Sequence, residues 1–289
     1  MTLRASTPLI GIGLMLMAMA ILPGIDVIAK YMGAHGTPVL QIVWARLAFG
    51  AVLTLPFAYR EAGARALLPR RPFLHGLRAS LLIAATFFFF WSLRFLPIAD
   101  ALAIFFVQPL VVTALSPLIL GERVGPRRWS AVAVGFIGTM IIIRPGLGTM
   151  NPGALLALAA GTSLALYFLL TRRIAGAQKA IVTTFHTNLL GGLITSVLVP
   201  LVWVIPTPTD WLLFLGLAAI ANVGHNFIVR AYDHAEASLL APLAYTEMVT
   251  STLMGLIFFG DFPDAMTFLG VAILISCAIY ISIRERAVR

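Results

Sequence analysis

Charge and cysteine are both scarce in this chain of 289 residues. Asp, Glu, Lys and Arg make up 11% of it and hydrophobic residues 60%, whereas about a quarter of a typical soluble domain is charged. The single cysteine, Cys277, excludes an internal disulfide, and its apolar surroundings identify it as a small core residue. This composition excludes an ordinary soluble domain and predicts an integral membrane protein.

Several catalytic signatures are also missing. The chain has no Gly-rich phosphate loop ending in Gly-Lys-Ser/Thr, no His-Glu-x-x-His and no Gly-x-Ser-x-Gly. We therefore expect neither a primary pump nor an enzyme, and no metal or cofactor. Tyr232-Asp233 and Gly260-Asp261 faintly resemble the paired motifs of intramembrane aspartyl proteases, but the topology predicted below puts them on opposite sides of the membrane, too far apart to share a water.

The formal net charge of +9 could suit nucleic acid. However, the Arg residues lie between apolar segments and form no basic run interleaved with aromatic residues. We therefore expect no nucleic-acid partner.

Apolar stretches long enough to cross a bilayer as helices, which takes about 20 residues, recur along the whole chain. Short connections rich in Pro and Gly, such as "RPGLGTMNPG" (144–153), separate them and leave no room for a soluble domain. The first stretch has an alternative interpretation as a cleaved signal peptide, because Ala18 and Ala20 are spaced like a cleavage site. The predicted fold is all-α, with ten transmembrane helices at residues 8–29, 39–59, 73–93, 99–120, 129–143, 153–171, 180–204, 211–229, 237–259 and 265–283.

The distribution of basic residues predicts the orientation of these helices. Fifteen of the 20 Lys and Arg residues fall on the termini and on one set of alternating connections, and three fall on the other set. Because basic residues gather on the cytoplasmic side, both termini are predicted to be cytoplasmic. Arg46 and Arg78 lie inside predicted helices and were not counted.

The two halves of the sequence resemble each other. "RFLPIADALAIFFVQPLVV" begins at Arg94 and "RAYDHAEASLLAPLAYTEMVT" begins at Arg230, and both lead into an apolar helix that ends in Gly followed by an acidic residue. The register slips by three residues partway, which places Gln108 opposite Glu247. Each half (1–147 and 148–289) carries five helices, and because five is odd the halves must insert with opposite orientation. Such inverted repeats are typical of secondary transporters.

Together these features resemble the drug/metabolite transporter superfamily, in its ten-helix EamA-like branch. The resemblance rests on "LALYFLLTRRI" (164–174), "SLLAPLAYTEMV" (238–249) and the Gly-acid helix ends, in order and at repeat spacing. The sequence departs from the family at Met248, where Pro is frequent, and at "LPGID" (22–26), where an aromatic residue is common. The resemblance implies a metabolite exporter of the bacterial cytoplasmic membrane.

Polar and aromatic residues inside the predicted helices are the candidates for a substrate cavity, because such groups are costly against lipid. The second half offers hydrogen-bonding groups and the first half more aromatic surface, which would suit an amphipathic zwitterion. Interhelical hydrogen bonding and simple packing stay open as alternatives. The candidate cavity residues are Trp44, Trp91, Gln108, Ser163, Tyr167, His186, Asn222, His225, Asn226, Tyr245 and Glu247.

Glu247 has three interpretations that the sequence leaves open. It could be the counter-charge to a cationic substrate, a proton carrier, or the structural partner of a buried Arg or His. Asp26 and Lys30, spaced i, i+4, are expected to form an ion pair that could act in gating. The prolines Pro23, Pro109, Pro117 and Pro242 are expected to interrupt or kink helices, and Pro23, Pro109 and Pro242 are candidate hinges.

We therefore expect a secondary transporter that exports small metabolites by alternating access, with aromatic or apolar amino acids as the leading substrates. Toxic organic cations are the alternative substrates, and a passive facilitator is the alternative mechanism. The expected partners are a small-molecule substrate, the lipid bilayer and protons in the case of coupled transport. The chain is expected to be a monomer or a weak homodimer.

Overall fold

The computed structural model describes residues 8–66, 68–69, 71–121, 124–144, 151–173, 180–235 and 240–286, and this part of the chain is helical and contains no strand. Helices or helix pairs occupy each of the ten predicted apolar windows. The α-helices are α1 Pro8–Ile21, α2 Pro23–Ala34, α3 Val39–Ala62, α4 Pro72–Ser92, α5 Ile98–Phe105, α6 Gln108–Leu120, α7 Pro126–Ile143, α8 Pro152–Arg173, α9 Ala180–Leu198, α10 Pro208–His234, α12 Thr246–Phe259 and α13 Ala265–Arg286; the 3-10 helices are η1 Gly63–Ala66, η2 Val199–Val202 and η3 Ala241–Tyr245.

Seven stretches within the described residues are long and apolar enough to cross a membrane. They correspond to α1 with α2, α3, α4, α5 with α6, α8, α9 with η2, and α10. Two shorter apolar helices cover Leu243–Phe259 and Ala265–Cys277. The all-helical membrane architecture is thus confirmed, while ten spans and the cytoplasmic termini stay predictions.

Several helices begin and end where local chemistry requires it. Proline occupies the first turn of α2, α4, α6, α7 and α10, where its missing N–H costs no hydrogen bond. Gly121 and Gly260 end α6 and α12 in the left-handed conformation at φ 71°, which glycine adopts without strain. The Gly-acid pattern shared by the two halves is therefore a helix stop.

Three of the ten predicted spans are interrupted near proline. Leu22 separates α1 from α2 just before Pro23, and Phe106 and Val107 separate α5 from α6 just before Pro109. Pro242 lies in η3, where a 3-10 helix precedes α12. The predicted interruptions are confirmed at these three prolines. Pro117, in contrast, lies inside α6 without ending the helix, and a hinge role for any of these residues stays a prediction.

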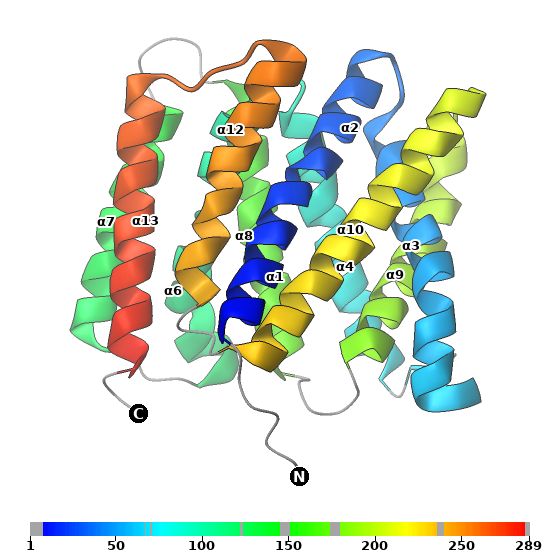
Figure 1. The fold of residues 1–289 in the computed structure, drawn as a ribbon, viewed down its shortest axis with the longest axis horizontal. Helices are drawn as coiled ribbons and strands as arrows, with labels where there is room; N and C mark the ends of the chain where they lie inside the picture. The colour runs from blue at the N-terminus through cyan, green and yellow to red at the C-terminus, as the bar shows by residue number, and fades with distance from the viewer. Residues whose placement is uncertain are drawn as a thin grey trace.

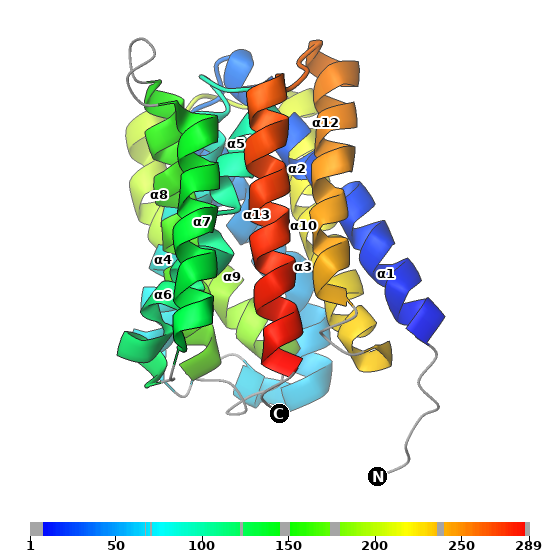
Figure 2. The same ribbon diagram turned by 90° about the vertical axis from the view of Figure 1, so that its left-hand side faces the viewer.

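The helices form one bundle in which each half of the chain packs against the other (Figures 1 and 2). The main contacts between the halves are α3 with α9, α4 with α8, α1 with α10, and α7 with α13. In the predicted repeat, α1 with α2 corresponds to α8, α3 to α9, α4 to α10 and α7 to α13. Exchanging each helix for its counterpart turns the α4–α8 contact into the α10–α1 contact. The α3–α9 and α7–α13 contacts are unchanged by the exchange. α1 begins and α13 ends at the same end of the bundle (Figure 1).

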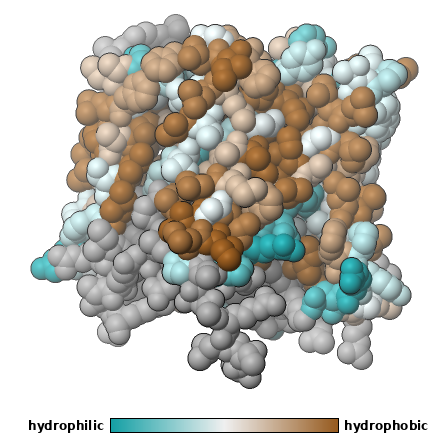
Figure 3. Space-filling view, viewed as in Figure 1, coloured by the Kyte–Doolittle hydropathy of each residue, from teal (hydrophilic) through white to brown (hydrophobic). Residues whose placement is uncertain are grey.

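Large hydrophobic side chains cover much of the outer surface (Figure 3). Leu118, Val197 and Ile257 are examples, with 82, 77 and 73% of their surface exposed. Apolar area of this extent is unfavourable in water and suits contact with lipid.

Candidate functional site

Arg46 is the centre of a polar group inside the bundle. It lies on α3 within a membrane-spanning segment, and its Nη1 donates a hydrogen bond to Thr86 Oγ1 on α4 at 2.7 Å. Arg46 also interacts electrostatically with Asp26 on α2 and with Tyr167 on α8, and with His225 on α10. Together with α3 itself, five helices thus contribute side chains to this polar group.

Two carboxylates complete this group. Asp26 is only 8% exposed, and it interacts repulsively with half-buried Glu247 on α12. Each of them lies in the first turn of a helix that follows an interruption, where the helix dipole stabilises a negative charge. We call Asp26, Arg46, Thr86, Tyr167, His225 and Glu247 the central cluster.

Neither carboxylate of the central cluster has a close partner. Within the part of the chain that the structure describes, no hydrogen bond is made by the side chain of Asp26 or Glu247, and the ion pairs are Lys30–Asp261 and Arg144–Asp264. Asp26 therefore interacts electrostatically with Arg46 and with Glu247 without forming an ion pair to either. A structural ion pair would instead bring nitrogen and oxygen within about 4 Å.

A second group of polar side chains surrounds Arg78, which is 1% exposed. Its Nε donates to Thr171 Oγ1 at 2.9 Å and its Nη2 to the Tyr167 hydroxyl at 3.2 Å. The guanidinium also lies 5.0 Å from the centre of the Tyr167 ring, a distance typical of cation–π contacts. Buried His75 and His186 pack beside it with ring centres 5.1 Å apart. Tyr167 thus contacts Arg78 directly and interacts electrostatically with Arg46.

The structure brings some of the predicted cavity residues together and separates others. Tyr167, His225 and Glu247 belong to the central cluster, which also includes Asp26, a residue assigned to gating by the sequence. His186 belongs to the group around Arg78. Because Asp26, Arg46 and Thr86 are polar groups from the first half, the expected division into an aromatic half and a hydrogen-bonding half is wrong.

Other candidates make contacts that explain them without a substrate. Trp44 donates from Nε1 to Ser196 Oγ at 2.8 Å, and Asn222 accepts a 3.4 Å hydrogen bond from Asn188 on the neighbouring helix α9. The Ser163 hydroxyl donates to the carbonyl of Ala159 in its own helix. Three candidates make no side-chain hydrogen bond among the described residues: Trp91, which is exposed and packs on Phe87, exposed Asn226, and half-buried Gln108 at the start of α6.

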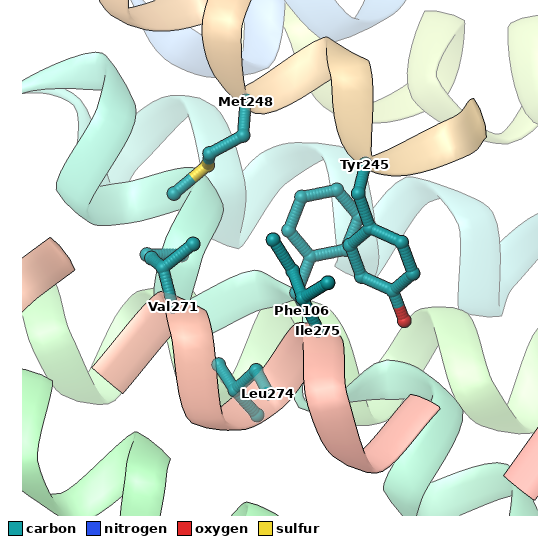
Figure 4. Close-up of a pocket in the computed structure, with 7 residues that line it drawn as sticks. Phe106, Tyr245, Met248, Val271, Leu274 and Ile275 are labelled. Carbon is teal, nitrogen blue, oxygen red and sulfur yellow. The ribbon is translucent and has the colours of Figure 1, made fainter. Parts of the chain in front are cut away.

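Tyr245 lies in a narrow apolar crevice rather than in the central cluster (Figure 4). Its ring contacts Phe106 with centres 5.4 Å apart, and side chains of α12 and α13 complete the lining. The lining residues are Ala103, Phe106, Tyr245, Met248, Val271, Leu274 and Ile275. The apolar lining offers packing surface and gives no polar group other than the tyrosine hydroxyl for recognition.

The expected ion pair between Asp26 and Lys30 is wrong. Lys30 Nζ instead contacts Asp261 Oδ2 at 2.6 Å and donates to the Leu96 carbonyl at 3.2 Å. The physical reason is tertiary. Because α2 packs against α12, the loop after α12 supplies an acceptor for Lys30, while Asp26 interacts electrostatically with Arg46.

Further contacts join the two halves at this end of the bundle, the upper end in Figure 1. Arg144, just after α7, pairs with Asp264, just before α13. This hydrogen-bonded guanidinium lowers the pKa of the Asp264 carboxyl to about 2. Gln41 exchanges two hydrogen bonds with the backbone of Val204, at 2.8 and 3.0 Å. We call the contacts of Lys30, Arg144 and Gln41 the cross-half latch.

Sequence reasoning missed Arg46 and Arg78 as site residues. Both appeared only as charges left out of the topology count, although an arginine inside a span is costly enough to require a function or a partner. Their position within apolar windows was the signal that could have identified them. The boundary at 147/148 and the acidic residues Glu122 and Glu236 of the repeat motifs lie outside the described residues.

Comparison with known proteins places these features in context. The model of the EamA-like transporter family matches residues 9–144 and again 151–283, on either side of the predicted boundary. The chain is similar to an S-adenosylmethionine uptake transporter of Rickettsia felis, with 26% identity over 97% of this chain and 95% of the relative.

Two further relatives carry other functions. A riboflavin transporter of Vibrio cholerae is 29% identical over 89% of this chain and 88% of its own. A pseudopaline exporter of Pseudomonas aeruginosa is 28% identical over 83% of this chain and 85% of its own. One crystal structure matches with a TM-score of 0.64 and 20% identity over 99% of both chains, which supports the fold alone.

Proposed function

The chain belongs to the EamA-like transporter family, within the drug/metabolite transporter superfamily, and from that premise we propose that it moves a small zwitterionic metabolite through the central cluster by alternating access. It is a multi-pass transporter of the bacterial inner membrane and not an enzyme. Amino acids, particularly aromatic and apolar ones, are the proposed substrates, and export is the proposed direction.

The observation that carries this proposal is the composition of the central cluster. Its charged groups lie deep in segments otherwise suited to lipid, where each of them costs about 2.5–3.5 kcal/mol on insertion scales. The first half supplies Asp26 and Arg46 and the second half supplies Glu247. A site shared between two halves is accessible from alternate sides when the halves rock against each other.

The packing of the two halves supports the same mechanism. The contacts between helices keep their pattern when each helix is exchanged for its counterpart, as expected for repeats. We propose that the halves, divided at 147/148, are inverted, that ten helices cross the membrane, and that both termini are cytoplasmic. The interruptions beside Pro23, Pro109 and Pro242 are the proposed hinges. The transporter is proposed to act as a monomer or a weak homodimer.

The relatives leave the substrate and the direction open. Their names include both uptake and export, and S-adenosylmethionine is itself an amino-acid derivative with an additional cationic sulfonium. An organic cation is the second candidate substrate, and the presence of two carboxylates beside one guanidinium in the central cluster favours it.

Counterflow in proteoliposomes tests the proposed function. Vesicles are loaded with unlabelled phenylalanine, methionine or S-adenosylmethionine, and uptake of the same labelled compound is followed, with tetraphenylphosphonium as the organic cation. Saturable exchange of an amino acid is the expected result. Exchange of the cation alone would replace the proposed substrate, and linear flux without counterflow would indicate a passive facilitator.

A further inference from the structure

The central cluster contains two carboxylates that no protein group compensates directly. Asp26 is more than nine-tenths buried, yet in the described part of the chain its carboxylate accepts no hydrogen bond and forms no ion pair, and the same holds for Glu247. A buried polar group without a partner is rare in folded proteins and requires an explanation. One guanidinium against two carboxylates leaves one negative charge in excess.

The oxygens of these carboxylates are not sealed inside protein. The fully buried side-chain atoms without a hydrogen bond, among the described residues, are Asp100 Oδ1, Arg144 Nε, His186 Nδ1 and Ser251 Oγ. Asp26 and Glu247 do not contribute an atom to this set, so their carboxylate oxygens keep some surface that water can reach. Both residues also lie beside helix interruptions, where irregular backbone at membrane depth lines ligand sites in transporters.

Arg46 has hydrogen-bond donors that remain available, as the two carboxylates have available acceptors. One hydrogen bond, from Nη1 to Thr86, holds the guanidinium in place, and its remaining N–H groups donate no hydrogen bond to the described residues. The planar fork of arginine matches a carboxylate with two parallel hydrogen bonds. Arg46 is thus oriented by Thr86 and retains donors for a carboxylate ligand.

We propose that the central cluster is a zwitterion site in which Arg46 binds the carboxylate of the substrate, while Asp26 and Glu247 together bind its ammonium or another cationic group. This inference rests on the proposed function and specifies the roles of individual residues in it. Thr86 is a positioning residue for Arg46. The excess negative charge suits substrates with net charge zero or +1, which includes both amino acids and amino-acid sulfonium compounds.

Competition by substrate analogues tests this assignment. The parent compound L-phenylalanine is compared with L-phenylalaninamide, which lacks the carboxylate, and with 3-phenylpropanoate, which lacks the ammonium group. In the wild-type protein, the parent is expected to compete for exchange at least about tenfold better than either analogue, because a site built for a polar group discriminates against its absence. If methionine or S-adenosylmethionine is the better substrate, the corresponding analogues of that compound are used.

The variants should separate the two ends of the substrate. Arg46→Gln is expected to reduce the preference for phenylalanine over phenylalaninamide to less than about twofold. The preference for phenylalanine over 3-phenylpropanoate should be retained. Asp26→Asn and Glu247→Gln should instead reduce the preference for phenylalanine over 3-phenylpropanoate and retain the preference over phenylalaninamide. Arg127→Gln, which removes an exposed arginine at the start of α7, is the matched control and should leave both preferences unchanged. The assignment would be overturned if the wild type exchanges the substrate and every variant either keeps both preferences or loses both to the same extent.

A thermal measurement tests the site without any substrate. In detergent, Asp26→Asn and Glu247→Gln should unfold at the same temperature as the wild type or higher, because each removes a charge without a partner. A fall of more than about 3 °C, roughly 1 kcal/mol for a protein of this size, would show a structural ion pair and overturn the inference. If the wild type exchanges none of the three parent compounds, the proposed function fails, and this measurement still decides the site.

Discussion

Individual charged residues in this protein fall into two kinds, according to whether a protein group satisfies them. The guanidinium of Arg78 donates hydrogen bonds to hydroxyl groups, contacts an imidazole and packs on the ring of Tyr167, so its charge is accommodated by structure. Asp26 and Glu247 have no such contacts in the described residues. Burial alone therefore does not separate a structural charge from a ligand-binding one, whereas the hydrogen-bond partners do.

The buried guanidinium of Arg78 should be important for stability. Replacing Arg78 with Gln removes charge-assisted hydrogen bonds to Thr171 and Tyr167, which are worth about 1.5–3 kcal/mol each, and we expect a loss of about 2–4 kcal/mol of unfolding free energy. Thermal unfolding in detergent measures the effect, with Arg128→Gln near the start of α7 as a second arginine variant. Equal unfolding temperatures for Arg78→Gln and the wild type would show that these contacts contribute little.

Asp264 should not contribute to the pH dependence of transport. Because hydrogen bonding to Arg144 lowers its pKa to about 2, the carboxylate is ionised throughout the physiological range. Its stabilising contribution is present above the ordinary pKa near 4 and is lost only as the pH falls through about 2. Asp264→Asn should therefore change the level of flux between pH 5 and 8 without changing the shape of the profile. A shifted midpoint in this range would contradict the assignment.

At the residue scale, the sequence predicted local features better than tertiary ones. It named Glu247, His225 and Tyr167 as candidate cavity residues, because polar groups inside an apolar span are costly against lipid; their role in binding stays a prediction. It wrongly paired Lys30 with Asp26, since a spacing of four residues cannot reveal that Asp261 approaches from a loop more than two hundred residues away. Arg46 gained its significance only when five helices were seen to converge on it.

Helices in this bundle approach closely where they carry small residues. A methyl group added to Gly161 on α8 would lie 2.6 Å from the carbonyl oxygen of Phe105, at the interruption between α5 and α6. Gly138 and Gly270 allow the same close approach of α7 and α13. The close approach at Gly161 is therefore a contact between the two halves.

Gly161→Ala should destabilise the protein, because a backbone oxygen cannot move aside as a flexible side chain can. We expect a cost of about 1–3 kcal/mol, typical of overpacking, measured as a lower unfolding temperature in detergent. Gly13→Ala on α1 is the matched control, since a methyl group there meets nothing within 4 Å, and alanine favours the helix. Similar unfolding temperatures for the two variants would contradict a close contact at Gly161.

Most helix positions followed from hydrophobicity, because a span must be apolar over about 20 residues to cross a bilayer. The beginning of α3 at Val39 and of α13 at Ala265 were predicted to the residue. The interruptions followed from proline chemistry at Pro23, Pro109 and Pro242. The apolar sequence could not indicate which helices would pack together, because lipid and helix neighbours favour similar side chains.

At the scale of the whole molecule, the two ends of α3 should lie on opposite sides of the membrane. In a variant without Cys277, cysteines at exposed His35, just before α3, and at exposed Arg60, near its end, can be labelled in intact cells. The positive-inside rule predicts that an impermeant thiol reagent labels the cysteine at 35 and not the one at 60. The opposite result would reverse the orientation and make the termini external.

The cross-half latch closes one end of the bundle, and its ion pairs and hydrogen bonds should bias the transporter toward that closed state. The Lys30–Asp261 pair is partly buried, with side-chain exposures of 17% and 29%, and Lys30 also packs over the ring of Phe259 at 4.9 Å. Lys30→Asp and Asp261→Lys should each place like charges together and favour opening at this end. A change of about 1 kcal/mol shifts the two-state equilibrium roughly fivefold.

Exchanging the charges of Lys30 and Asp261 in a double variant distinguishes an ion pair between them from two independent effects. With a reporter cysteine in place of Ser163 in a Cys277→Ala background, each single variant should increase the labelling rate by an impermeant reagent added from the predicted outer side by about fivefold. The double variant, Lys30→Asp with Asp261→Lys, restores opposite charges and should return the rate toward that of the parent. Additive increases in the double variant would mean that the two residues act separately, and the latch would then depend on Gln41 and Arg144 instead.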